Sequence, residues 1–188
     1  MNEKDFEKII ELTRLAGKLK KIERTGWVNW VKVEDPESVA EHTFRMALLG
    51  MMVADIKKLN TEKIVEMILL HDIHESVMGD WDYFAKKKLG KDSFKKREKE
   101  SIEEISSSIP EGLKEKYYEL MKELSEEKTE EARLIKQIDR LEMLFQALDY
   151  EKEGYDKKRL DAFWAFHEKD FVDPDLKKIF ELLKQRRE

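Results

Sequence analysis

The sequence contains no cysteine and only 3 prolines and 7 glycines among its 188 residues. The missing cysteine excludes a disulfide framework and any thiolate metal site, so a transition-metal site must be built from His, Asp and Glu. The few turn-forming residues argue against a sheet protein. No apolar run reaches the about 18 residues that cross a membrane, and the charged, amphipathic amino terminus is unlike a secretion signal. We therefore expect a cytoplasmic protein without a membrane partner.

Charged residues make up 42% of the chain and hydrophobic residues 40%. This balance favours helices with well-solvated outer faces, so it predicts an all-α fold. With 188 residues the chain is long enough for one domain with a substantial core, and we expect a single domain over 1–188. The formal net charge of −5 provides no overall field to attract nucleic acid. The expected partner is therefore a small molecule.

Apolar residues recur at the helical period along most of the chain. The pattern predicts helices over 5–20, 36–59, 61–76, 111–124, 127–152 and 157–168, a charged helix before Pro110, and loops over 23–36 and at the start of 81–100. Asp35, Pro36 and Glu37 predict a helix start, because they combine a capping side chain, a proline in the first helical position and an acid in the first turn. Asp173 and Pro174 open a short last helix by the same reasoning.

Three of the expected helices carry polar side chains inside an apolar stripe. His42 lies in line with Met46 on the 36–59 helix, because steps of three and four place residues on one helix face. His71 and Asp72 stand near the end of the almost entirely apolar 61–76 helix. Asp139 falls within the core stripe of the 127–152 helix. All three helices thus offer polar groups to the same interior.

These four side chains would satisfy one another if they surrounded a divalent cation. Such a cation accepts nitrogen and oxygen ligands together and offsets the charge of two carboxylates. Alternatively, His42 is an ordinary hydrogen-bonded core histidine, and His71 and Asp72 form a helix-end pair. Asp139 would then need a buried salt bridge to Arg133, to Arg140 or to a distant cation. One shared site explains all four residues, whereas the alternatives need three independent buried exceptions.

The order of the four residues is His42, then adjacent His71 and Asp72, then Asp139. This order is the pattern of the HD superfamily of metal-dependent phosphohydrolases, which the sequence resembles closely. Five short sequence segments around these residues strengthen the resemblance: RTGW at 24–27, PESVAEH at 36–42, HDIHE at 71–75, GD at 79–80 and KQIDRLEMLFQALDYE at 136–151. They look like the branch that contains the bacterial 5′-deoxynucleotidases and HD domain-containing protein 2. The resemblance covers essentially the whole chain.

The resemblance implies a single-domain helical bundle of HD type with the metal site between helices. Its core would span about 36–152, with the carboxy-terminal helices in 157–188 packed on it. The implied activity is hydrolysis of the 5′-phosphate of deoxyribonucleoside monophosphates with one divalent metal ion. Mn²⁺ or Co²⁺ is favoured as that ion, while Fe²⁺, Ni²⁺, Zn²⁺ and Mg²⁺ stay open. A homodimer is also expected, with FQALDYE (145–151) and AFWAFH (162–167) as either dimer surface or core.

Two carboxylates gain catalytic roles through the resemblance. Glu75 lies one turn after His71 and would accept a proton from the attacking water or hold that water. The alternative is an ordinary solvated glutamate at a helix end. Asp80 resembles a second functional carboxylate, either as the acid for the leaving 5′-oxygen or as a contact to the sugar. His74 is left off the ligand set, because the family pattern does not require it and it fits a partly exposed helix end.

Arg24 and Trp27 are the expected substrate-binding residues. An arginine suits bidentate phosphate binding, and a tryptophan offers a flat surface for a sugar or base. The alternatives are a surface arginine and a core tryptophan, and the sequence does not decide between Trp27 and Trp30 as the contact. His167 stands among aromatic residues and is expected to be structural.

Two further functions stay open from the sequence. One is another HD phosphohydrolase, which would act on a phosphodiester, a cyclic nucleotide or a nucleoside triphosphate. The other is a helical binding or scaffold protein that keeps the metal only structurally. The presence of Glu75 and Asp80 argues against a purely structural metal, because such a site does not need them.

Overall fold

The computed structural model describes residues 1–187, which form helices joined by short connections. The α-helices are α1 (Glu3–Lys18), α2 (Val39–Lys57), α3 (Thr61–His71), α4 (Glu75–Met78), α5 (Tyr83–Leu89), α6 (Lys91–Ser107), α7 (Glu111–Glu126), α8 (Glu130–Glu153), α9 (Lys157–His167) and α10 (Pro174–Gln185). Short 3-10 helices cover Leu19–Lys21 and Glu168–Asp170, and a π-helix covers Trp27–Val31. Within residues 1–187 there is no strand, only an isolated bridge between Glu23 and Ser38. The all-α prediction is confirmed.

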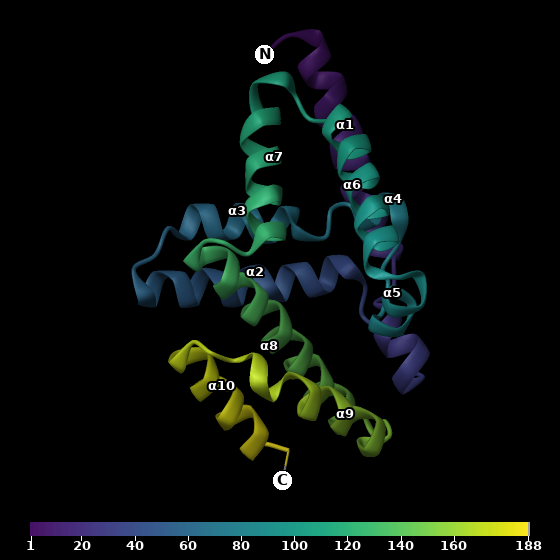
Figure 1. Cartoon of the computed structure of the whole chain (residues 1–188), viewed down its shortest axis with the longest axis vertical. Helices are drawn as coiled ribbons and strands as arrows, with labels where there is room; N and C mark the ends of the chain where they lie inside the picture. Colours follow the sequence, from purple (N-terminus) through teal and green to yellow (C-terminus); the bar gives the residue numbers. More distant parts are fainter. Residues whose placement is uncertain (188) are drawn as a thin grey trace.

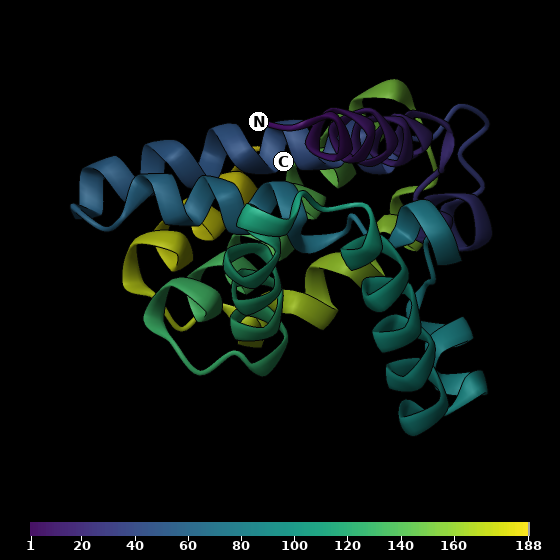
Figure 2. The ribbon, with the colours of Figure 1, turned by 90° about the horizontal axis from the view of Figure 1, so that it is seen from above.

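The antiparallel pair α2 and α3 lies across the middle of the molecule (Figure 1). α7 and α8 pack against this pair, and α9 and α10 pack against α8. α4 packs against both α1 and α6, on the side of the molecule away from α10. Figure 2 shows that α5 and α6 project away from the bundle there. The two termini lie at opposite ends of the long axis (Figure 1). No helix in the described part of the chain is long and apolar enough to cross a membrane.

Two apolar cores hold these helices together. The larger core unites α2, α3, α7, α8, α9 and α10 around residues such as Met46, Ile68 and Leu141. The smaller core unites α1 with Ile73 and with Ile105 of α6. Burial of this apolar surface is the main force that stabilises the bundle. The polar residues singled out above therefore sit between helices that are fixed by packing.

α2 begins three residues later than the sequence predicts. Its amino-terminal cap is Ser38, whose side chain accepts a hydrogen bond from the Glu41 backbone N–H at 3.2 Å, while the Glu41 carboxylate accepts one from the Ser38 backbone N–H at 2.7 Å. This reciprocal capping box satisfies two free N–H groups at once, so it outcompetes the single cap offered by Asp35. The prediction for Asp173 and Pro174 is confirmed, because Asp173 caps α10 and Pro174 is its first residue.

The predicted helix over 61–76 is wrong in one respect, because it ends at His71. The Asp72 backbone leaves the helical range at φ −110° and ψ 14°, and α4 starts only at Glu75. The turn between them sends Ile73 into the smaller core beside α6, whereas Ile68 stays in the larger one. A straight helix could not fill both cores. The break therefore reorients His71, Asp72 and Glu75 relative to one another.

Two segments expected to be loops are partly helical. Asp82 caps α5 by accepting a hydrogen bond from the Ala85 backbone N–H at 2.8 Å, and Gly90 ends it at φ +89°, a conformation that glycine adopts without strain. In the segment 23–36, the π-helix Trp27–Val31 buries Trp27 and Val31 in the larger core. The polar and β-branched residues that suggested loops are therefore caps and core residues.

Candidate metal centre

His42 projects from α2 into the protein interior. It is fully buried, and its Nδ1 pairs with a carboxylate oxygen of Glu142, which is fully buried on α8. Its Nε2 is buried without a hydrogen-bond partner and lies 3.3 Å from Oδ1 of Asp139. A carboxylate on Nδ1 fixes the ring orientation and leaves Nε2 as the free donor atom. His42 is therefore not an ordinary core histidine with both nitrogens satisfied.

His71, at the end of α3, is arranged in the same way. Its Nδ1 lies 2.5 Å from the backbone oxygen of Ile68, to which it donates a hydrogen bond. Its Nε2 is buried without a hydrogen-bond partner, 2.9 Å from Oδ2 of Asp72. The centres of the His42 and His71 rings are 5.5 Å apart. Both histidines therefore have Nδ1 occupied and Nε2 unpaired, next to carboxylates.

The two carboxylates complete the cluster. Ligand atoms of His42, His71 and Asp72 all lie within 4.8 Å of one another, and Asp139 on α8 approaches from the His42 side. Burial acts to raise the pKa of Asp72, but His71, Arg24 and His42 outweigh it and hold that pKa well below its usual range. The pKa of Asp139 is also lowered, because its contact with His42 outweighs burial. Both side chains are therefore carboxylates at neutral pH.

The donor set fits a divalent cation. Two unpaired imidazole nitrogens and two ionised carboxylates, from three helices and the turn after α3, are the ligands that first-row metal ions accept together. Burial acts to lower the pKa of His42, but Asp139 and Glu142 outweigh it and raise the pKa to about 10. A proton and a metal ion compete for the same nitrogen. The negative charges of Asp139 and Glu142, which stabilise a proton on His42, therefore also favour a bound metal ion. The ligand roles of His42, His71, Asp72 and Asp139 stay predictions.

A neighbouring cluster is already neutralised by an arginine. Glu37, His42 and Glu142 also come within 4.8 Å of one another. Arg45 lies among them, with Nε 2.7 Å from Glu142 and Nη2 3.7 Å from Glu37. Burial, followed by the charge of Glu142, raises the pKa of Glu37 to about 7. This cluster is therefore a support behind His42.

Arg24 reaches the cluster from the segment before α2. Its guanidinium lies 3.4 Å from Asp72, 3.7 Å from Asp80 and 3.9 Å from Asp139. Burial acts to lower the pKa of Arg24, but these three carboxylates outweigh it and keep the group cationic. Arg140, the cation considered above for Asp139, instead pairs with Asp170 at 2.9 Å. Arg24 is therefore a partly buried cation beside the predicted ligands.

Asp80 and Glu75 are both held inside the site. Oδ2 of Asp80 accepts hydrogen bonds from the Thr25 backbone N–H at 2.5 Å and from the Thr25 hydroxyl at 2.6 Å. Glu75 is buried, and its Oε2 has no hydrogen-bond partner. Burial, together with the charges of Asp72 and Asp80, raises the pKa of Glu75 well above its usual range. The alternative of a solvated helix-end glutamate is therefore wrong.

A cavity of about 430 Å³ opens beside this cluster. Arg24, Asp80 and Asp139 line it and also belong to the cluster, so the two features are continuous. Its other lining residues are mainly aromatic or apolar: Trp27, Trp30, Trp81, Tyr83, Phe84, Met143, Phe163 and Phe166. The sequence did not predict that these residues meet in one cavity, although the aromatic segments WDYF (81–84) and FWAF (163–166) stand out in it. The site therefore combines a polar end with an aromatic one.

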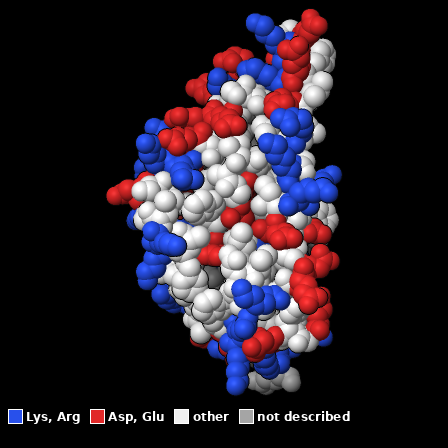
Figure 3. All heavy atoms as spheres, turned by 90° about the vertical axis from the view of Figure 1, so that its right-hand side faces the viewer, with Lys and Arg blue, Asp and Glu red and all other residues white. Residues whose placement is uncertain are grey.

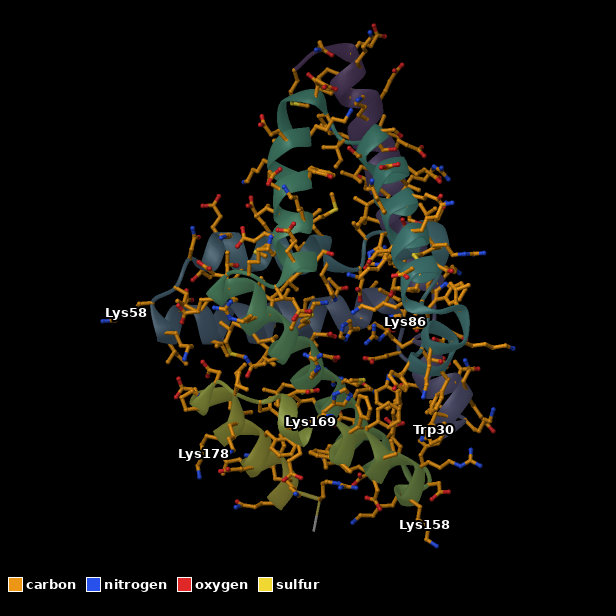
Figure 4. All side chains as sticks on the ribbon, in the orientation of Figure 1. Trp30, Lys58, Lys86, Lys158, Lys169 and Lys178 are labelled. Atoms are coloured by element: carbon orange, nitrogen blue, oxygen red, sulfur yellow. The ribbon has the colours of Figure 1, made fainter. Side chains whose placement is uncertain are left out.

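The two tryptophans in question have different positions. Trp27 is buried, stacks on Phe163 with ring centres 4.5 Å apart, and donates its indole N–H to Glu37 at 2.8 Å. Trp30 is exposed and stacks on Phe84 with ring centres 4.9 Å apart. Figure 4 shows Trp30 and Lys86, which both line the cavity, on the side of the molecule that carries α5. Trp27 thus forms the floor of the cavity and Trp30 its mouth.

The remaining histidines lie outside the predicted ligand set. His74 is buried rather than partly exposed as expected, and its Nε2 lies 3.9 Å from Glu98 of α6. Burial lowers the pKa of His74, which favours the neutral ring. His167 pairs through Nδ1 with Asp170 at 3.0 Å and lines the cavity.

Surface charge is mixed on the side that carries α5 and α6. Figure 3 shows lysines and arginines interspersed with aspartates and glutamates across this face, without one continuous basic surface. Several of these lysines face glutamates of α6 itself, such as Lys96 with Glu100 at 3.9 Å and Lys99 with Glu103 at 3.7 Å. Exposed pairs of this kind contribute little stability and mainly balance charge.

Fold and site together define an all-α protein with a candidate His/Asp metal centre and an adjoining aromatic cavity. The family model of the HD domain matches residues 16–179, so the chain belongs to the HD domain family. The protein named 5′-deoxynucleotidase HDDC2 in Mus musculus is 34% identical over 179 residues, 95% of this chain and 88% of that protein. Its namesake in Dictyostelium discoideum is 36% identical over 180 residues, 90% of this chain and 93% of that protein. A solved structure of a conserved hypothetical protein from Pyrococcus furiosus has 31% identity and a TM-score of 0.75, and covers 95% of this chain and 98% of its own.

Proposed function

We propose that this protein is a metal-dependent phosphomonoesterase that hydrolyses the 5′-phosphate of deoxyribonucleoside 5′-monophosphates. The curated relatives from mouse and Dictyostelium bear the name 5′-deoxynucleotidase and align over at least 90% of this chain. The observation that carries the proposal is the pair of buried, unpaired Nε2 atoms of His42 and His71 beside ionised carboxylates. The cavity at this cluster, with a volume of about 430 Å³ and a largely aromatic lining, suits a nucleoside.

His42, His71, Asp72 and Asp139 would hold one divalent ion, with Mn²⁺ or Co²⁺ as our first choice. When bound, such an ion neutralises charge on the phosphoryl oxygens and lowers the pKa of water. Arg24 remains cationic beside these ligands, and its planar guanidinium suits two phosphate oxygens at once. It would place the phosphate between the polar cluster and the aromatic cavity.

Glu75 would act as the base or anchor for the attacking water. It lies next to Asp72 and makes no hydrogen bond through Oε2, so this oxygen is free to contact the attacking water. Two hydrogen bonds from Thr25 hold Oδ2 of Asp80. The other oxygen, Oδ1, therefore faces Arg24 and the cavity. Asp80 would therefore meet the leaving 5′-oxygen or the sugar, and Trp27 would support the sugar from the floor of the cavity.

A phosphate-release assay on a substrate panel tests this function. The panel sets dAMP, dGMP, dTMP and dCMP against the ribonucleotides and bis(p-nitrophenyl) phosphate, each with Mn²⁺, Co²⁺ or Mg²⁺. We expect release from the deoxynucleotides. Activity on the diester alone would instead favour another HD phosphohydrolase. Metal binding without any release would favour a structural metal.

We also propose a homodimer as the working form. The two segments expected to supply its surface are largely internal, because Leu148 and Trp164 are buried in the larger core. Phe163 and Phe166 line the cavity. The cytoplasmic location and the absence of nucleic-acid and membrane partners stay predictions from the sequence.

A further inference from the structure

His167, the last residue of α9, takes no part in the function proposed above. It lines the cavity together with Phe163, which lies one turn earlier on the same face of α9. Phe163 stacks on Trp27, so this face of α9 lies against the floor of the cavity. The His167 ring also packs edge-on against Phe166, with ring centres 4.9 Å apart. A purely structural role for His167 therefore leaves its position in the cavity wall unexplained.

A carboxylate behind the ring fixes how His167 presents its two nitrogens. Oδ2 of Asp170 lies 3.0 Å from Nδ1 of His167 and 2.9 Å from Nε of Arg140. Arg140 is anchored further, because its Nη1 donates to the Lys136 backbone oxygen at 3.2 Å. The carboxylate accepts a hydrogen bond from Nδ1 and so keeps the proton on that nitrogen. Burial lowers the pKa of His167, so the ring is neutral at neutral pH.

The second ring nitrogen of His167, Nε2, is free to meet a ligand. Within residues 1–187 it makes no hydrogen bond, and it is not one of the buried polar atoms without a partner. It therefore keeps access to the cavity that the residue lines. A neutral ring with its proton on Nδ1 offers Nε2 only as an acceptor. Such an atom repels phosphate oxygens, so His167 requires a hydroxyl or an N–H group on the ligand.

The position of His167 along the cavity identifies this donor. The charge of Asp139 acts on His167, which places the ring toward the polar end. On its other side Phe166 packs against Tyr83 at the cavity mouth, with ring centres 5.3 Å apart. A 5′-nucleotide with its phosphate at Arg24 and its base at the mouth has its sugar between them. A 2′-deoxyribose esterified at its 5′-oxygen carries one hydroxyl there, the 3′-hydroxyl.

We propose that His167 is a specificity residue that accepts a hydrogen bond from the 3′-hydroxyl of a bound nucleotide. Asp170 orients the ring through Nδ1, and Arg140 holds Asp170 in place. This contact rests on the proposed function, because it names the sugar atom that the same cavity recognises. It favours nucleotides with a free 3′-hydroxyl over those that lack this group or carry a phosphate on it.

Paired substrates that differ only at the 3′ position test the contact. We compare kcat/KM for dAMP and for 2′,3′-dideoxyadenosine 5′-monophosphate (ddAMP) in the wild type and in His167→Leu. The wild type should prefer dAMP, and His167→Leu should reduce this preference by about 5-fold to 10-fold, the worth of one hydrogen bond. Phe166→Leu is the matched control, because it changes a neighbouring cavity residue without a polar atom. It should keep the wild-type preference, whatever its effect on the two separate rates.

Two further arms separate a sugar contact from a base contact and from a folding defect. The same comparison with dTMP and its 2′,3′-dideoxy analogue should give the same change, because the sugar is common to both pairs. His167→Gln should retain part of the preference, because its side-chain carbonyl can still accept a hydrogen bond. Thermal unfolding confirms that each variant folds.

The outcomes distinguish the contact from the proposed function. Phosphate release from dAMP with the same preference in the wild type and His167→Leu overturns the His167 contact alone. A change confined to the adenine pair shows a base contact and also overturns it. No release from dAMP or dTMP by the wild type overturns the proposed function, and this contact with it.

Discussion

The candidate metal centre and the aromatic cavity share residues but are built in different ways. In the centre, the histidine rings are oriented by hydrogen bonds that their Nδ1 atoms donate, from His42 to the Glu142 carboxylate and from His71 to the Ile68 carbonyl. At the cavity mouth, Trp30 and Phe84 are exposed and held mainly by stacking on each other. A metal ion requires fixed ligand geometry, whereas the face of a base tolerates small shifts of its partner. We therefore expect the reaction to depend on the rigid region and substrate recognition to depend on the adjustable one.

The largest effect should follow from removing a ligand at the rigid end. Asp139→Ala, and likewise Asp72→Ala, should abolish metal binding, because the centre loses one of its four predicted ligands and one of the two carboxylates that offset the charge of the ion. Titration calorimetry with Mn²⁺ on the apo protein measures this. Asp161→Ala, a change at an exposed carboxylate paired with Arg187, should bind metal normally. Metal binding that survives in Asp139→Ala contradicts its role as a ligand.

Glu75→Gln should separate chemistry from metal binding. The variant should bind metal like the wild type, while hydrolysis falls by about 100-fold to 10,000-fold, the range for loss of a general base. Single-turnover phosphate release and the same calorimetry give the two readouts. If Glu75→Gln loses metal as completely as Asp139→Ala does, then Glu75 is a ligand and not a base.

Glu142→Gln should weaken the support behind the centre without removing a ligand. The amide cannot match the carboxylate that holds Nδ1 of His42, so metal affinity should fall by about 10-fold to 100-fold. Asp149→Asn is the control, because it also contacts Arg45 but does not touch His42. Thermal unfolding of the apo proteins separates loss of stability from loss of affinity. An equal loss of metal affinity in both variants would show that the contacts of Arg45, and not the contact of Glu142 with His42, support metal binding.

The smallest effect should appear at the adjustable end. Phe84→Ala removes one stacking face at the cavity mouth, so KM for a deoxynucleotide should rise about 5-fold with little change in kcat. Steady-state kinetics with dAMP measure this, and Tyr118→Ala, an exposed aromatic outside the cavity, is the matched control. A fall in kcat instead of a rise in KM would mean that Phe84 belongs to the rigid region.

The sequence predicted the parts of the molecule that depend on local periodicity. The position of His42 on the buried face of α2 follows from steps of three and four, and its complete burial confirms that part of the prediction. The break after His71 was not predictable, because no glycine or proline marks it and two separate cores cause it. The cavity was not predictable either, because it also depends on tertiary packing. Its aromatic residues come from α5 and the connection before it, from α9 and from the π-helix, and only tertiary packing brings them together.

A chain of buried contacts connects the floor of the cavity with His42. The Trp27 indole donates to Glu37, Arg45 bridges Glu37 and Glu142, and Glu142 holds His42. A tryptophan that is buried and bonded to a carboxylate is an optical reporter, because its emission depends on nearby charge. Trp27 is one of four tryptophans in the chain, and its contacts link it to the candidate metal centre, so we expect its emission to change when metal is titrated into the protein.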